Sequence, residues 1–310
     1  MLVLVSCALV ILSRFALNLV PDNTYGYVGV AFLQAIIFLL PGIFFVRLSH
    51  SGKVWASDVC LSKKDFSKEN MGFRTIRIEN IFLIISAFLF LVFSTLVLDM
   101  LFRGIKYQTD SFELYSTFIV SKVNTPYAAI YPTVAFALIP AVCEEFFFRG
   151  ILMCSYKKQG FFCAAITSTV FYMIFSFNPT HIPSSLVAGF CFCLVLLASK
   201  SLYACMTVHF LYNLYGIFLQ TNIADYYTSL TNKTLIIIMA IFFFVLSVFL
   251  FASELARVFL KRTRSDDSLR LFEARGAKDF FASVARNFLN VPSAACAVMY
   301  IASYAVEIFF

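Results

Sequence analysis

The sequence contains very little charge for its length. Only 13% of its 310 residues are Asp, Glu, Lys or Arg, whereas 61% are hydrophobic and the mean hydropathy is +0.87. A soluble globular domain carries about 25% charged residues, because its surface must be solvated. The composition therefore excludes a soluble globular protein and predicts an integral membrane protein.

Several motifs that would indicate other chemistry are missing. The nine cysteines include no CxxC pair, so neither a disulfide framework nor a thiolate zinc site is predicted. No HExxH motif of a helical zinc protease is present. The segment before Pro21 has no basic n-region and carries Arg14 within its apolar run, so we expect a first membrane helix rather than a cleaved signal peptide.

The chain has instead a series of apolar runs, each long enough to cross a bilayer. A membrane-spanning helix needs about 20 mostly apolar residues. Such runs occupy residues 2–20, 27–46, 81–102, 126–148, 160–177, 182–199, 202–219, 234–256 and 288–310. The sequence therefore predicts an all-α, polytopic membrane protein with about nine transmembrane helices.

The polar residues divide these runs into three parts. We expect residues 1–125 to form three transmembrane helices with a cytoplasmic loop. Residues 126–219 are expected to form a catalytic core of four helices. Residues 220–310 are expected to add two transmembrane helices and an amphipathic segment, 261–287, that lies on the cytoplasmic membrane surface.

The 24 Lys and Arg residues gather in alternate loops. Segments 47–80 and 257–286 hold most of them, and the loops on the opposite side hold few. Basic residues accumulate on the cytoplasmic side of a membrane. We therefore expect the protein to span the cell membrane with its N-terminus in the cytoplasm. The net charge of +7 is then explained by topology and by contact with membrane lipid, and it does not indicate nucleic acid.

The few charged residues inside the predicted spans are informative. Glu144, Glu145 and Arg149 lie in an otherwise uncharged run from Asn124 to Lys157. A central charge costs about 3 kcal/mol in insertion experiments, so such residues line a polar cavity or pair with one another. On a helix Glu145 and Arg149 share a face, and Glu144 points about 100° away. We expect Arg149 to hold Glu145 ionised and Glu144 to face a cavity. A buried ion-pair network that only fixes packing is the alternative.

Two more polar features lie in the following spans. His181 follows Asn178-Pro179, a pair that ends helices. A straight helix from Gly160 would place His181 at the far membrane face. His209 and Asn213 lie one turn apart on one helix face. Two donors on one face suit an oxyanion that develops during hydrolysis. Hydrogen bonding between helices is their alternative role.

These residues form three motifs in chain order. They are EExxxR at Glu144–Arg149, FxxxH at Phe177–His181 and HxxxN at His209–Asn213. Together, on successive membrane segments, they resemble the signature of the CAAX protease and bacteriocin-processing family (CPBP, or Abi) of intramembrane endopeptidases. The resemblance covers about a third of the chain.

The resemblance implies a mechanism and partners. Glu144, assisted by His181, would activate a water molecule that attacks a peptide carbonyl. His209 and Asn213 would stabilise the oxyanion. Glu145 and Arg149 would organise the site. No cofactor is expected. The substrate would be a peptide or protein, lipidated as in eukaryotic and some archaeal members, or bacteriocin-like as in many bacterial relatives.

Two other functions stay open. One glutamate and two histidines can also bind a catalytic zinc ion, which would make the protein a zinc-dependent intramembrane protease. The absent HExxH motif and the pairing of His209 with Asn213, a poor zinc ligand, argue against this. In the second alternative, the polar cluster belongs to a membrane transporter or to a non-proteolytic bacteriocin-immunity scaffold. Many transporters contain an internal repeat, and the chain shows no repeat between its halves.

Overall fold

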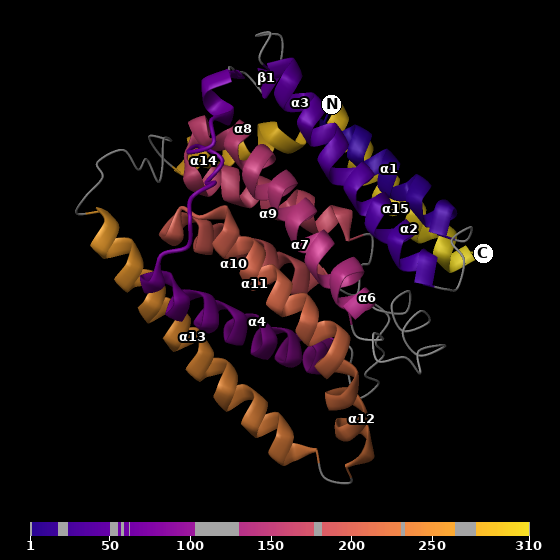
Figure 1. The fold of residues 1–310 in the computed structure, drawn as a ribbon, viewed down its shortest axis with the longest axis vertical. Helices are drawn as coiled ribbons and strands as arrows, with labels where there is room; N and C mark the ends of the chain where they lie inside the picture. The colour runs from indigo at the N-terminus through magenta and orange to yellow at the C-terminus, as the bar shows by residue number, and fades with distance from the viewer. Residues whose placement is uncertain are drawn as a thin grey trace.

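The computed structural model describes residues 2–17, 24–49, 55–56, 59–61, 63–102, 130–176, 182–230, 233–263 and 277–309. Nearly all of these residues are helical, and the predicted class, an all-α polytopic membrane protein, is confirmed (Figure 1). Extended structure among them is limited to one short antiparallel pair, β1 (Trp55–Ala56) with β2 (Val59–Cys60).

A helix lies at each of the nine predicted spans. The helices are α1 (Leu2–Leu17); α2 (Thr24–Gln34), η1 (Ala35–Leu39) and α3 (Leu40–Ser49), which form one run; α4 (Ile81–Phe102); the run that carries Glu144; α9 (Phe161–Phe175); α10 (Ile182–Ser199); α11 (Leu202–Tyr215), extended by η9 (Gly216–Gln220); α13 (Thr234–Thr263); and α15 (Val291–Phe309). Within the described ranges, five helices are long and apolar enough to cross a membrane, and three apolar helices are shorter.

The run that carries Glu144 is an uninterrupted helix with two π-helical stretches. It consists of α6 (Ile130–Pro132), η5 (Thr133–Leu138), α7 (Ile139–Glu145), η6 (Phe146–Leu152) and α8 (Met153–Tyr156). A π-helical turn inserts an extra residue and redirects the side chains that follow, and such turns are frequent at functional sites. The second stretch begins directly after Glu145 and contains Arg149.

The segments predicted as the four-helix core lie in the middle of the molecule. Helix α10 packs against α9 and α11, and α4 packs against both α10 and α11. Helix α13 covers the outer side of α4, and α1 packs against α15 on the opposite flank, so that the first and last helices lie side by side (Figure 1). The core is thus enclosed by helices from both ends of the chain.

Close packing in this core depends on small residues and aromatic rings. A Cβ at Gly189 on α10 would lie 3.0 Å from Thr169 Cγ2 on α9, so glycine permits the two helices to approach closely. Phe147 and Phe148 are fully buried and contact Phe38 of η1. Between membrane helices such van der Waals packing replaces the hydrophobic drive of water-soluble cores.

Among the described residues, two further α-helices lie outside the predicted spans. They are α12 (Thr221–Ser229) and α14 (Ala277–Phe288). Helix α14 covers the end of the predicted amphipathic segment, and residues 264–276 lie outside the described part of the chain. Its buried Asn287 donates from Nδ2 to Thr167 Oγ1 of α9 at 3.1 Å, while Phe281 is exposed. One face of α14 is therefore fixed to the core and the other is free.

Candidate active site

The predicted pairing of Glu145 with Arg149 is present in the centre of the core. Arg149 Nη1 donates to Glu145 Oε1 at 3.0 Å, and both side chains are completely buried. Arg149 Nη2 donates to the carbonyl oxygen of Gly189 at 2.9 Å, which ties the ion pair to α10. A buried charge needs a partner of opposite sign, so the pairing allows both side chains to lie inside the core.

His209 joins the two neighbouring glutamates. Its Nδ1 lies 2.9 Å from Glu145 Oε1, and its Nε2 lies 3.9 Å from Glu144 Oε2. The imidazole is almost fully buried, whereas 19% of the Glu144 side chain is exposed. Sequence reasoning assigned His209 to a pair with Asn213 and missed its contact with both carboxylates, because residues so far apart in sequence give no local signal.

The hydrogen bond to Glu145 determines how His209 can act. An ionised carboxylate only accepts, so Nδ1 must carry the proton in this contact. When the ring is neutral, Nε2 therefore presents a lone pair towards Glu144. When the ring is protonated, Nε2 becomes a donor at the same position. The geometry thus places the second ring nitrogen on the side of the more exposed carboxylate.

Aromatic rings enclose this cluster. The Phe192 ring stacks on the His209 ring at 4.8 Å, and the Tyr172 ring meets it edge-on at 6.1 Å. The Arg149 guanidinium lies 4.6 Å from the Tyr172 centroid and 5.0 Å from that of Phe192. These rings keep water away from the ion pair and add cation–π attraction. Nothing in the sequence distinguishes them among 39 phenylalanines and 15 tyrosines.

Asn213 lies one turn further along α11. Its Nδ2 donates to the carbonyl oxygen of Ala137 in η5 at 3.4 Å, close to the limit for a hydrogen bond. The Asn213 amide therefore lies against the helix that carries the glutamates. It bonds to the backbone of that helix and not to a glutamate side chain. Its convergence with His209 on one oxyanion stays a prediction.

The FxxxH motif lies outside the described residues. Phe177 and His181 belong to a segment of which only the flanking helices α9 and α10 are described. Among the residues that are described, no group of three His, Cys, Asp or Glu side chains is arranged to hold a metal ion. The zinc alternative requires His181 as a ligand, so both the mechanism with His181 and this alternative stay predictions.

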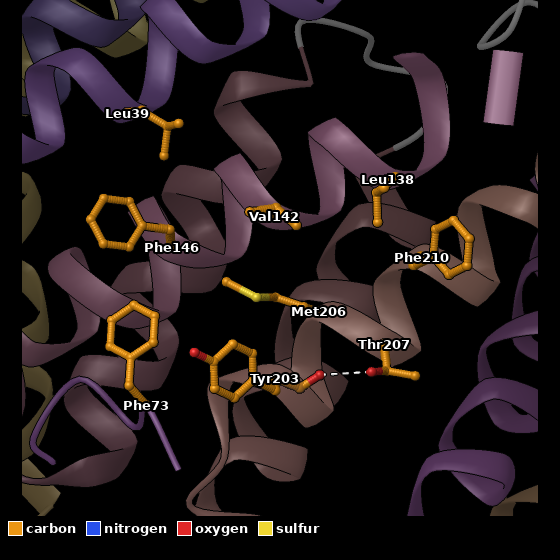
Figure 2. Close-up of a pocket in the computed structure, with 9 residues that line it drawn as sticks. All are labelled: Leu39, Phe73, Leu138, Val142, Phe146, Tyr203, Met206, Thr207 and Phe210. Atoms are coloured by element: carbon orange, nitrogen blue, oxygen red, sulfur yellow. Dashed lines mark hydrogen bonds between the residues drawn. The ribbon is translucent and has the colours of Figure 1, made fainter. Parts of the chain in front are cut away.

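An apolar groove runs along the outer side of the same helices. The cavity has a volume of about 370 Å³ and is lined by Leu39, Phe73, Leu138, Val142, Phe146, Tyr203, Met206, Thr207 and Phe210 (Figure 2). The hydroxyl of Thr207 is already bonded to the Tyr203 carbonyl oxygen at 2.8 Å. Volumes of about 300–1,000 Å³ are typical of small-molecule sites. No pattern in the sequence predicted this groove.

The groove and the ionisable cluster share two helices. Val142 and Phe146 flank the two glutamates in sequence, and Met206 and Phe210 flank His209. The helices α7 and α11 pack directly against each other. They present ionisable side chains on the inner side of their contact and apolar side chains on the outer side.

The fold and the cluster define a polytopic membrane protein with a buried centre of carboxylate, guanidinium and imidazole groups. Residues 126–215 match the family model described as Rce1-like, type II CAAX prenyl endopeptidase Rce1-like. This match confirms the family resemblance predicted from the three motifs, all of which lie within the matched segment. No curated protein and no solved structure gave a match.

Proposed function

We propose that the protein is a CAAX-type intramembrane endopeptidase that hydrolyses a peptide bond of a lipidated substrate with a water molecule activated by Glu144. One observation carries the proposal. His209 bridges Glu144 to the buried Glu145–Arg149 pair, within the segment that matches the family model. Paired acids in different environments acquire different proton affinities, which is how one of them becomes a base.

The two glutamates are assigned different roles because their contacts differ. Glu145 is completely buried, and its Oε1 accepts from both Arg149 and His209, which suits a positioning role. Glu144 Oε2 lies 3.9 Å from His209 Nε2, beyond hydrogen-bond distance, and the Glu144 side chain is partly exposed. It can therefore take a proton from water and return it to the leaving amine. His181 is proposed to share this task.

His209 and Asn213 are proposed to stabilise the oxyanion. In its protonated form His209 Nε2 donates, and Glu145 balances the added charge through Nδ1. Asn213 supplies the second donor when it exchanges its long hydrogen bond with Ala137 for one to the substrate. Such an exchange costs little, because a 3.4 Å bond is weak. Donors preorganised in a dry site are worth about 3 kcal/mol each in the transition state.

The groove is proposed to hold the prenyl chain of the substrate. Its lining is almost entirely apolar, and it follows the two helices that carry the site. A prenyl chain gains little from leaving lipid for another apolar surface, so the fit of the groove must provide the affinity. The description of the matched family names a CAAX prenyl endopeptidase. With the predicted topology, the substrate would be a membrane-anchored protein at the cell membrane.

The proposal is tested with the full chain in lipid vesicles. The substrate is a farnesylated peptide with a CAAX tail, and mass spectrometry locates the cleaved bond. We expect cleavage by the wild type and none above background by Glu144→Gln. Glu69→Gln, at an exposed acid of the loop before α4, serves as the control and should cleave normally. Equal turnover by Glu144→Gln and the wild type would overturn the proposal.

A further inference from the structure

Two aromatic rings contact both Arg149 and His209. They belong to Tyr172 of α9 and Phe192 of α10, and they meet each other edge to face at 6.2 Å. The Arg149 guanidinium lies over both rings, while the His209 ring stacks on Phe192 and meets Tyr172 edge-on. We call these two side chains the aromatic clamp. The clamp connects the ion pair on the run that carries Glu144 to the imidazole on α11.

Phe192 is held in register with His209 by a backbone contact. Its side chain is completely buried, and its ring lies 4.8 Å from the imidazole with the two planes inclined by only 19°. Cys205 lies one turn before His209 on α11, and its Sγ donates to the Phe192 carbonyl oxygen at 3.3 Å. This bond joins α10 to α11 beside the stacked rings, so it opposes sliding of one ring along the other.

Tyr172 lies against α10 at a glycine. A Cβ at Gly189 would lie 3.2 Å from Tyr172 Cδ1, which is tighter than most contacts of this kind. The carbonyl oxygen of the same glycine accepts from Arg149 Nη2 at 2.9 Å. The Tyr172 ring also packs edge-on against Phe148 at 5.3 Å. Gly189 therefore allows the Tyr172 ring and the Arg149 guanidinium to share one turn of α10.

The hydrogen bond to Glu145 does not by itself fix the direction of the His209 ring. This bond, at Nδ1, holds a single atom and allows the ring to turn about the bond. The direction matters, because the ring places Nε2 3.9 Å from Glu144 Oε2. A flat ring stacked on the imidazole opposes such a turn, and an edge-on ring beside it limits sideways movement. The aromatic clamp supplies both contacts.

We propose that Tyr172 and Phe192 are positioning residues that hold His209 in one orientation at the reaction centre, and that they act through their rings. The inference rests on the proposed function, in which His209 donates to the oxyanion, and adds the residues that aim this donor. A misplacement of about 1 Å in an active site can cost about 100-fold in rate. The contacts of Tyr172 with Arg149 and His209 are made by its ring, so phenylalanine should replace it and leucine should not.

The first arm of the test observes His209 directly by nitrogen NMR. The protein contains three histidines, so labelling histidine with ¹⁵N gives few signals, and His209→Ala identifies those of His209. In lipid nanodiscs, the wild type should give one set of ring-nitrogen signals for His209. Phe192→Leu and Tyr172→Leu should give several sets or broadened signals, while Tyr172→Phe should keep the wild-type spectrum. Phe281→Leu, at an exposed ring of α14, is the matched control and should change nothing.

The second arm measures cleavage of the farnesylated CAAX peptide. Phe192→Leu and Tyr172→Leu should lower kcat by about 10- to 100-fold while KM stays within about twofold, because a misdirected donor affects the transition state and not substrate binding. Tyr172→Phe should keep kcat within about twofold of the wild type. Thermal unfolding is measured for each variant, and Phe192→Met is the second variant at this position if Phe192→Leu does not fold.

The two arms distinguish the inference from the proposed function. If the wild type cleaves no peptide above the Glu144→Gln background, the proposed function fails, and the spectra still decide whether the aromatic clamp orients His209. If the folded leucine and methionine variants keep the wild-type spectrum, or change it while kcat stays unchanged, the inference is overturned and the proposed function stands. Equal losses of kcat in Tyr172→Phe and Tyr172→Leu would overturn the action through the ring.

Discussion

The ionisable cluster and the apolar groove lie on opposite sides of the same pair of helices. On the inner side, Glu145, Arg149 and His209 are almost completely buried. Arg149 and His209 both bond to Glu145, and aromatic rings lie against them. On the outer side, the groove has hardly any polar group. Under the proposed function, the two adjacent helices would separate chemistry from recognition. Their packing holds the ionisable groups in place, while groove residues can change without breaking an ion pair.

The largest effect is expected from breaking the buried pair. Glu145→Gln leaves Arg149 without its counter-charge, and breaking a buried pair costs about 3–5 kcal/mol. We expect a lower unfolding temperature together with loss of cleavage, measured by thermal denaturation and peptide hydrolysis in the same detergent. Glu144→Gln is the matched control, since it makes the same chemical change one residue away and should leave the unfolding temperature near that of the wild type. Equal stability losses in both variants would contradict the division of roles.

A smaller loss tests the proposed oxyanion donors. His209→Ala and Asn213→Ala should each reduce kcat by about 10²–10³-fold with little change in KM, as expected of groups that act in the transition state. Their double variant should lose less than the product of the single losses, because both act on one oxyanion. A rise in KM with unchanged kcat would assign the two residues to substrate binding instead.

The groove is expected to respond differently from the cluster. Val142→Ala and Met206→Ala remove apolar lining without touching an ion pair. We expect KM for a farnesylated peptide to rise several-fold while kcat stays within about twofold, because uniform binding is lost. The same peptide without the prenyl group should show no such difference between variants and wild type. A fall in kcat with unchanged KM would show that groove and cluster are not separable.

No effect is expected from chelation. If His181 and His209 act at different points around the carbonyl, they need not converge on one ion. Activity should then survive o-phenanthroline and EDTA, with an inert phenanthroline analogue as control, and the purified protein should contain well under one zinc per chain. Loss of activity on chelation and stoichiometric recovery with zinc would support the metal-dependent alternative and make the glutamate and histidines ligands.

The sequence predicted those features that depend on local composition or helical periodicity. The span predicted at 182–199 coincides with α10 (Ile182–Ser199), because a long apolar run in a bilayer has no alternative to a helix. The Glu145–Arg149 contact follows from the shared helical face of residues four apart. The π-helical stretches η5 and η6 were not predicted, since a single inserted residue leaves no pattern in an apolar run.

The features that sequence reasoning missed arise from contacts between distant segments. The bond of His209 to Glu145 joins α11 to α7, and neither residue indicates the other. The groove exists because side chains from four segments leave space between them, and the loop that carries Phe73 is held there by bonds from Ser201 and Leu202. Such features depend on side-chain volumes and on helix orientations, which periodicity does not specify.

The central claim is that Glu144 performs the chemistry without contributing to binding. The most direct test measures turnover and peptide affinity together for wild type and Glu144→Gln in lipid nanodiscs, with one farnesylated CAAX peptide. The account predicts that Glu144→Gln binds the peptide with the wild-type Kd while turnover falls by about 10²–10⁴-fold, as expected for loss of a general base. Near-normal turnover by Glu144→Gln, or a loss of binding that accounts for the whole decrease in activity, would contradict it.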